Sequence, residues 1–249
     1  MRSIKAGMIF LFCLYAVIGE GNDQKKQVEG ALNYLSELIA QKYQLSTTGY
    51  QVAMVKNTRR LTPKRAQEYT AKAKELFKTE TLKNLGLLQS KYINCVPESG
   101  FLSSPHEMNE GQLTSCLGRV REKNFANCDM QALEVAIHIY ALGFKNISVI
   151  SNKAISHNYV VLEPNNLFPK GAIVDSWTGF GFMELNTATK LKYKHSSANI
   201  EMVQSMMSWL KKNAVTSANN AWIVDIRRKY FRGVSVPLQT ILKPISGKK

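Results

Sequence analysis

The sequence predicts an α+β fold in which helices come first and an antiparallel sheet follows. Apolar residues recur every three or four positions over 25–43 and again over 129–142, as they do in amphipathic helices. Short runs rich in β-branched residues follow at 145–151, 157–163 and 171–177. Helices that precede a group of adjacent strands are typical of helices packed on an antiparallel sheet.

Two helices are expected in the N-terminal part of the chain. From 25 to 43 one face is apolar and consists of Val28, Leu32, Leu35, Leu38 and Ile39. Thr62 and Pro63 suit the start of a second helix, which extends to Phe77. Residues 51–56 between them are either a short strand or a connection. We expect the two helices to pack together.

The first 21 residues resemble a secretory signal peptide in composition. Arg2 and Lys5 precede an apolar stretch at 8–19, and polar residues follow it. The stretch is shorter than the roughly 20 residues that a membrane-spanning helix needs. Gly19 and Gly21 suit cleavage, so we expect export; the alternative is a buried N-terminal helix.

The chain is strongly basic, with a formal net charge of +15. Its lysines and arginines are scattered along the sequence and do not alternate with aromatic residues. This charge favours attraction to an anionic surface or an acidic protein. No specific nucleic-acid-binding motif accompanies it.

The number of cysteines points to a free thiol. Loss of Cys13 with the leader leaves three cysteines, so one must stay unpaired within a monomer. Residues 92–124 contain two prolines and three glycines, and we expect a loop with one short helix there. Cys95 and Cys116 lie in this segment and suit a disulfide in an oxidising compartment, which leaves Cys128 free. The alternative is that all three are reduced and two pack in the core.

Cys128 lies at the predicted start of the central helix. Asn127 or Asn124 suits the N-terminal cap, and Gly143 suits the end. A helix N-terminus beside an imidazolium lowers the pKa of a thiol and makes it nucleophilic. The backbone amide of Cys128 is placed to stabilise an oxyanion, and Asn124 and Gln112 are candidate side-chain donors.

His157 and Asp175 are predicted to lie together on the strands that follow. A hairpin that closes symmetrically around residues 164–170 pairs Tyr159 with Asp175 and His157 with Trp177. His157 and Asp175 then project from the same face as diagonal neighbours. Such an aspartate accepts a hydrogen bond from one ring nitrogen and leaves the other for the thiol.

The other histidines suit this role less well. His138 lies ten residues beyond Cys128 on the same helix, about 15 Å along its axis. Helical phase groups it with the polar residues Gln131 and Glu134. His106 and His195 are expected to be solvated at the surface.

The C-terminal part is predicted to add a helix and edge strands. Apolar spacing indicates a helix over 198–212. Strands are expected at 222–224 and 234–242, although Pro237 interrupts the second. No pair of ligands has the close spacing of a zinc site, so we expect neither a metal nor a cofactor.

Three short motifs resemble a known group of enzymes. The segments 126–128, 157–161 and 173–177 are similar to the Gly-Asn-Cys, His-x-Phe-Val and Val-Asp-Pro-Trp motifs of papain-like and transglutaminase-like cysteine enzymes. Among these, secreted bacterial effector and toxin proteases and glutamine deamidases are most similar. The resemblance covers residues 124–177, about a fifth of the chain.

The resemblance implies a papain-like core whose nucleophile begins a helix packed on an antiparallel sheet. It assigns Cys128 as nucleophile, His157 as general base and acid, and Asp175 as its orienting partner, with Asn127 and Trp177 near the substrate. Ala126 and Ser176 depart from the usual glycine and proline. Neither departure removes a reacting group, although both change the local backbone constraints.

These observations predict a secreted enzyme that acts on a protein substrate. The expected organisation is a leader at 1–21, a helical region at 22–92 and a catalytic region at 93–249, the last two as one compact unit. Proteolysis, glutamine deamidation and transglutamination all proceed through a thioester, and the sequence does not separate them. The alternative is an exported, non-catalytic interaction protein with the same fold.

Overall fold

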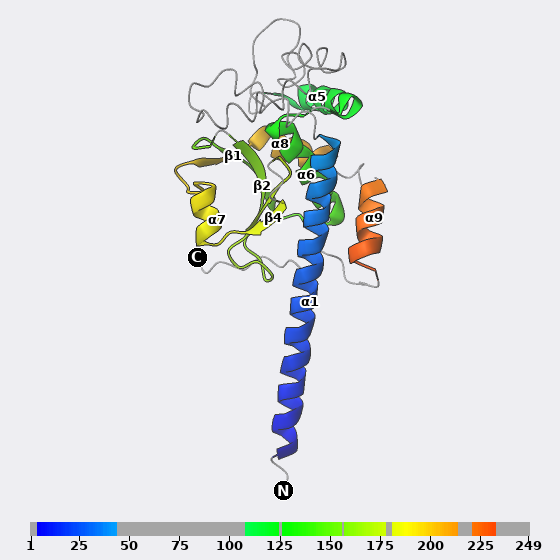
Figure 1. Ribbon diagram of the computed structural model, residues 1–249, viewed down its shortest axis with the longest axis vertical. Helices are drawn as coiled ribbons and strands as arrows, with labels where there is room; N and C mark the ends of the chain where they lie inside the picture. Colours follow the sequence, from blue (N-terminus) through cyan, green and yellow to red (C-terminus); the bar gives the residue numbers. More distant parts are fainter. Residues whose placement is uncertain are drawn as a thin grey trace, which may run out of the picture.

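The computed structural model describes residues 4–43, 108–124, 126–155, 157–177, 181–213 and 221–232, with backbone alone for 4–22 and for Lys123. Within these ranges six helices accompany one five-stranded antiparallel sheet (Figure 1), which confirms the predicted α+β class. The helices are α1 (Ile4–Lys42), α5 (Glu110–Lys123), α6 (Cys128–Leu142), α7 (Thr187–Lys192), α8 (Gln204–Asn213) and α9 (Ala221–Tyr230). The strands are β1 (Ile147–Asn152), β2 (His157–Leu162), β3 (Ala172–Asp175), β4 (Gly181–Glu184) and β5 (Ile200–Met202).

The strands of the sheet lie in the order β4-β3-β2-β1-β5. In the β2–β3 hairpin, Val160 pairs with Val174 and Leu162 with Ala172. This register is the one that the symmetric hairpin predicts. The register sets the relative positions of His157 and Asp175, since a slip of one residue would turn one of these side chains to the other face.

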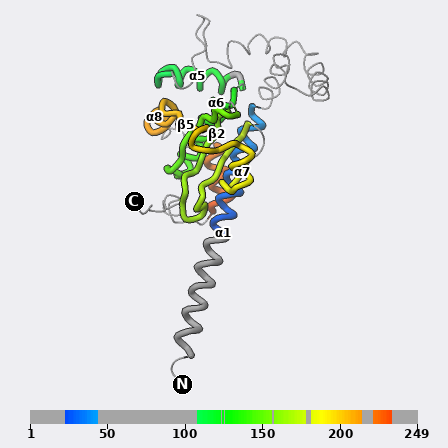
Figure 2. The backbone as a smooth tube through the Cα atoms, turned by 90° about the vertical axis from the view of Figure 1, so that its left-hand side faces the viewer, coloured from blue at the N-terminus to red at the C-terminus, as the bar shows by residue number. Residues whose placement is uncertain are grey.

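The two faces of the sheet are covered differently. One face packs against α1, α6 and α8, and α5 and α9 pack on these helices to complete the larger core. The other face carries a smaller cluster around Tyr159, Ile173 and Tyr193, beside α7. Figure 2 shows α8 and α7 on opposite sides of the sheet.

Helix α6 is the central helix of the larger core. Ten consecutive residues from Met130 to Ile139 are buried. The polar residues that share one helical phase, Gln131, Glu134 and His138, are therefore inside the protein. Glu134 accepts two hydrogen bonds from Arg121 on α5, at 2.7 and 3.0 Å, and one from the hydroxyl of Tyr43 at 2.9 Å.

The predicted helix over 25–43 is confirmed as part of α1, which packs in the same core as α6. Among the described residues, no helix combines the length and hydropathy needed to span a membrane. The short helix expected within 92–124 is α5. The predictions for 51–56, for the helix from Thr62 to Phe77, for His106 and for the strand at 234–242 lie outside the described residues.

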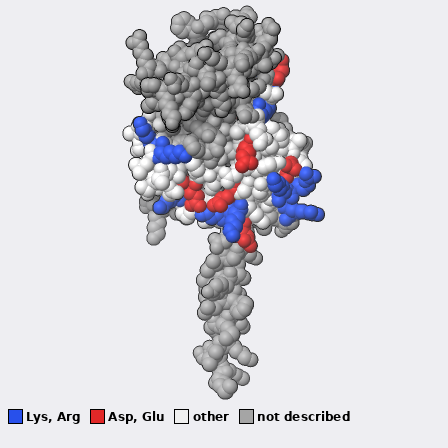
Figure 3. All heavy atoms as spheres, viewed as in Figure 1, with Lys and Arg blue, Asp and Glu red and all other residues white. Residues whose placement is uncertain are grey.

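Of two C-terminal predictions, the helix over 198–212 is confirmed in part by α8, and the strand at 222–224 is wrong. Residues 200–202 form strand β5 and not the start of a helix, because they pair with the free edge of β1, with Ile150 opposite Met202. Residues 222–224 lie in α9 and not in a strand, because Ile223 and Ile226 face the core at helical spacing. Figure 3 shows basic side chains over α9, whose last turn contains Arg227, Arg228 and Lys229.

The β2–β3 hairpin depends on a glycine where it enters β3. Gly171 has φ +80°, and a Cβ atom there would lie 2.6 Å from the carbonyl oxygen of Leu162. We expect Gly171→Ala to lower the free energy of unfolding by about 1–3 kcal/mol, because both the backbone conformation and the contact become strained. Urea unfolding followed by circular dichroism measures this change.

Gly118→Ala is the matched control. Gly118 lies inside α5, and a Cβ atom there would meet nothing within 4 Å. Alanine is the better helix former, so this variant is expected to be up to about 1 kcal/mol more stable than the parent. Equal effects of the two substitutions would contradict the role assigned to Gly171.

Candidate functional site

The helix that carries Cys128 begins as its sequence predicts. Asn127 is the N-cap, with φ −77° and ψ 179°, and its side chain accepts a hydrogen bond from the backbone amide of Met130. Cys128 is therefore the first residue of α6, it is half-buried, and its thiol is free. The first amides of a helix have no partner within the helix, so the amide of Cys128 is available to an oxyanion.

His157 and Asp175 form a buried pair. Nε2 of His157 lies 2.8 Å from Oδ2 of Asp175, and the two side chains are 9% and 1% exposed. His157 opens β2 and Asp175 closes β3, so the hairpin register brings them together. The predicted histidine–aspartate contact is thus confirmed.

The Asp175 carboxylate is held from several sides. Its Oδ1 accepts from the backbone amide of Trp177 at 3.0 Å, and its Oδ2 also accepts from the Tyr193 hydroxyl at 2.8 Å. The backbone carbonyl of Asp175 accepts from Ser36 on α1 at 3.1 Å. Donors to both oxygens fix the rotation of the carboxylate. Through its contact with Nε2, the carboxylate in turn fixes the orientation of the His157 ring.

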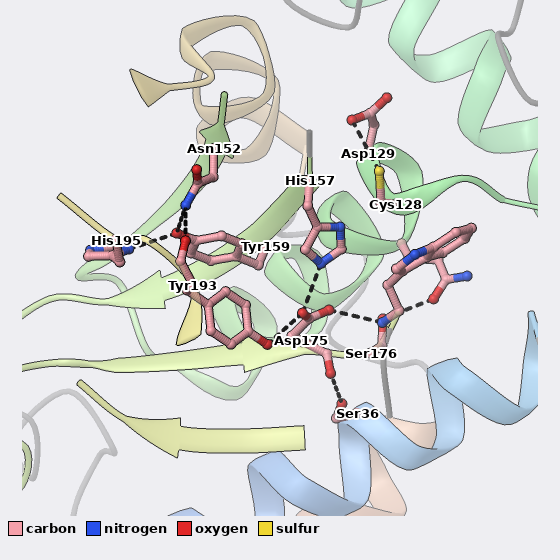
Figure 4. Close-up of polar contacts among 12 residues, drawn as sticks. Ser36, Cys128, Asp129, Asn152, His157, Tyr159, Asp175, Ser176, Tyr193 and His195 are labelled. Carbon is pink, nitrogen blue, oxygen red and sulfur yellow. Dashed lines mark hydrogen bonds and ion pairs between the residues drawn. The ribbon is translucent and has the colours of Figure 1, made fainter. Parts of the chain in front are cut away.

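Cys128 lies near this pair. Figure 4 shows the His157 ring between Cys128 and Asp175, with Nε2 directed to the aspartate. Among the described residues, Sγ and the imidazole do not hydrogen-bond to each other. Sγ lies 3.8 Å from Oδ1 of Asp129. The structure therefore brings the three predicted residues together, with the thiol turned toward Asp129.

The predicted lowering of the thiol pKa is wrong for this arrangement. Burial raises the pKa of Cys128 well above its ordinary value, and the carboxylates of Asp129 and Asp175 raise it further. The amides of Asn158 and Asp129 favour the thiolate but do not outweigh these effects. A charge in a low-dielectric site is costly unless it is paired, so the thiol is protonated here.

Sequence reasoning missed a polar group beside the pair. Asn152 of β1 donates to the Tyr159 hydroxyl at 3.1 Å and to the Tyr193 carbonyl at 2.7 Å. The Tyr159 hydroxyl lies 2.7 Å from Nδ1 of His195. The expectation that His195 is solvated is therefore only partly met, because the turn after α7 folds it onto β2 and leaves it half-buried. Its position within a basic segment gave no signal of this long-range contact.

The side-chain oxyanion candidates lie at the two ends of α5. Gln112 takes part in the capping box at the N-terminus, where its side-chain oxygen accepts from the amide of Asn109. Asn124 is the exposed C-cap, with φ 51°. No described contact joins either side chain to Cys128, so their catalytic role stays a prediction, as does substrate contact by Asn127 and Trp177.

Gln131 is a further residue that the sequence did not single out for the site. It lies one turn after Cys128 and is fully buried. Its Oε1 accepts from the Ser176 hydroxyl at 3.1 Å, and its Nε2 donates to the Ala126 carbonyl at 3.3 Å. It thereby links the loop before the nucleophile to the end of β3. The spacing of three residues from Cys128 is the only sequence signal for it.

Within the described part of the chain, no group of three or more His, Cys, Asp or Glu side chains could hold a metal ion. Comparison with known protein families, curated proteins and solved structures finds no match.

The Asp129 carboxylate is predicted to restrain the thiol. Its negative charge disfavours the thiolate, so Asp129→Asn should lower the pKa of Cys128 and move the pH profile of iodoacetamide labelling to lower pH. Peptide mass spectrometry measures the labelled fraction of Cys128 against time at each pH.

Glu110→Gln provides the control for this prediction, because Glu110 is a carboxylate on α5 that pairs with Lys212 and is not among the groups that shift the pKa of Cys128. Its profile should match that of the parent. An Asp129→Asn profile that stays in place or moves to higher pH would contradict the electrostatic argument.

Proposed function

We propose that this protein is a secreted cysteine enzyme with a papain-like or transglutaminase-like core, which acts on proteins as a peptidase or a glutamine deamidase or transglutaminase. The observation that carries the proposal is the buried 2.8 Å contact between His157 and Asp175 beside a free cysteine that begins a helix. A histidine oriented by an acid next to a thiol is the arrangement that nucleophilic cysteine catalysis requires.

In the first half-reaction, the thiol proton of Cys128 passes to Nδ1 of His157. The sulfur then attacks the carbonyl carbon of a peptide bond or a glutamine amide, and the amide of Cys128 donates to the oxyanion. The C–N bond breaks, and the leaving amine or ammonia takes the proton from His157. A thioester on Cys128 results.

In the second half-reaction, water or an amine gives a proton to His157 and attacks the thioester carbon. The C–S bond breaks, and the thiolate regains its proton from His157. Water yields an acid, which corresponds to proteolysis or deamidation, and an amine yields a new amide, which corresponds to transglutamination. The same three side chains support all of these outcomes.

Proton transfer to His157 changes the electrostatics at the sulfur. The imidazolium brings a positive charge next to the thiolate, and Asp175 stabilises that imidazolium through Nε2. This charge opposes the effects of burial and of Asp129 on the pKa of Cys128. Rotation of the thiol from Asp129 toward Nδ1 accompanies the transfer.

Two further observations support the cellular setting. Cys116 is disulfide-bonded. Disulfides are typical of secreted proteins, so the bond supports export and the predicted pairing with Cys95. The basic side chains over α9 support an acidic protein substrate or an anionic surface.

The second candidate function is an exported, non-catalytic interaction protein on the same fold. The contact between the Cys128 thiol and Asp129 favours this second function, because a cysteine that stays protonated is a poor nucleophile. In this reading, the His157–Asp175 pair only stabilises the hairpin.

Thiol labelling separates the two candidates. An enzyme should label rapidly with iodoacetamide at about pH 6, where an ordinary thiol is almost fully protonated. We expect His157→Ala to slow the labelling of Cys128 by on the order of 10²-fold, the usual contribution of a general base. His195→Ala is the control, because His195 contacts Tyr159 and neither Cys128 nor Asp175.

Labelling of Cys128 no faster than that of a free cysteine, together with no effect of His157→Ala, would support the interaction protein instead. If labelling is fast, incubation with a glutamine-rich protein and a primary amine resolves the reaction. Mass spectrometry then distinguishes new chain ends, glutamine converted to glutamate, and amine attached to glutamine.

A further inference from the structure

Asp175 receives two donors on one oxygen. Oδ2 lies 2.8 Å from Nε2 of His157 and 2.8 Å from the hydroxyl of Tyr193. A carboxylate only accepts hydrogen bonds, so the Tyr193 hydroxyl donates its proton here. Asp175 and Tyr193 are both almost fully buried, and a charge-assisted hydrogen bond at such a site is among the stronger ones in proteins.

Tyr193 is fixed in position by contacts at its backbone and its ring. It is the C-cap of α7, where its amide donates to the Thr189 carbonyl, and its own carbonyl accepts from Asn152 at 2.7 Å. Its ring meets that of Tyr159 edge to face, with the centroids 5.1 Å apart. The position of the hydroxyl is therefore set by α7, β1 and β2 together.

We propose that Tyr193 is a positioning residue that holds Oδ2 of Asp175 against Nε2 of His157, so that Nδ1 stays directed to Cys128. This inference rests on the proposed function for its catalytic meaning. The Trp177 amide donates to Oδ1 and the Tyr193 hydroxyl to Oδ2, so loss of that hydroxyl removes one of the donors that fix the rotation of the carboxylate. Rotation would weaken the alignment of the imidazole with the thiol.

Other ionisable groups surround the pair. Cys128 and Asp129 approach from α6, Tyr159 lies beside His157 on β2, and His195 follows α7. Burial raises the pKa of Tyr159 to about 12. Burial also lowers the pKa of His195, and the positive charge of nearby Lys190 lowers it further. Tyr159 is therefore a neutral tyrosine in the same cluster, and its hydroxyl bonds to Asn152 and His195 and not to Asp175.

Tyr159→Phe is the matched control for Tyr193→Phe. Each variant removes one hydroxyl from the same aromatic cluster, and only Tyr193→Phe removes a donor to Asp175. We expect Tyr193→Phe to slow iodoacetamide labelling of Cys128 by about tenfold, the order of one hydrogen bond to a charged group. Tyr159→Phe should label within about twofold of the parent, since it removes no bond to the charged group.

A proton NMR signal tests the geometry without any substrate. The Nε2 proton of His157 is buried and bonded to Asp175, and its downfield resonance is assigned by its absence from His157→Ala. We expect Tyr193→Phe to shift and broaden this resonance and Tyr159→Phe to retain it. The proposal would be overturned if Tyr193→Phe matched the parent in both the labelling rate and the resonance. It would also be overturned if Tyr193→Phe and Tyr159→Phe changed these readouts equally.

The two measurements also separate this inference from the proposed function. If labelling of Cys128 is slow in every protein, including the parent, the enzyme proposal fails. The resonance then still reports whether Tyr193 fixes the histidine–aspartate pair. If labelling is fast and His157-dependent but neither readout responds to Tyr193→Phe, the enzyme proposal stands and the role of Tyr193 fails.

Discussion

The pairing of β2 with β3 is the constraint on which the candidate site depends. The register that places Val160 opposite Val174 also places His157 and Asp175 on one face at the open end of the hairpin. The connecting loop is held by Asn165, whose side chain accepts from the amides of Leu167 and Phe168. A slip of one residue would turn one of the two polar side chains toward the larger core and break the contact between them, which would leave a polar group buried without that partner. The buried contact and the apolar pattern of the strands therefore select the same register.

Helix α6 brings the nucleophile to this hairpin and is itself fixed by polar contacts. Near its start, Gln131 bonds to Ser176 just beyond β3. One turn later, Arg121 of α5 pairs with the buried Glu134 and holds the pKa of that carboxyl below its usual value, against the opposite effect of burial. A buried carboxylate needs such partners, because an unpaired charge in the core is strongly unfavourable. These contacts of Gln131 and Glu134 hold the N-terminus of α6 beside the start of β2 and the end of β3. They thereby fix how far the Cys128 thiol must rotate to reach His157.

The site combines a well-ordered acid–base pair with a thiol held in its neutral form. Asp129 contributes to both properties. It lies in the first turn of α6, where a negative charge interacts favourably with the helix dipole. The same carboxylate lies next to the sulfur and opposes the thiolate. Asp129 thus stabilises the helix but disfavours the thiolate of Cys128. The positive charge of a protonated His157 can offset this second effect.

The sequence by itself determined the central helix, a cap at Asn127 or Asn124, the β2–β3 register and the pairing of His157 with Asp175. These features follow from short-range periodicity and from the geometry of one hairpin, both of which are visible in a local segment. Only the tertiary structure decided that residues 221–230 form a helix, that residues 200–202 complete the sheet, and that Tyr193 and His195 fold back onto β2. The direction of the Cys128 pKa shift belongs to the same group. Each of these depends on burial and on partners distant in the chain, and a local pattern contains neither quantity.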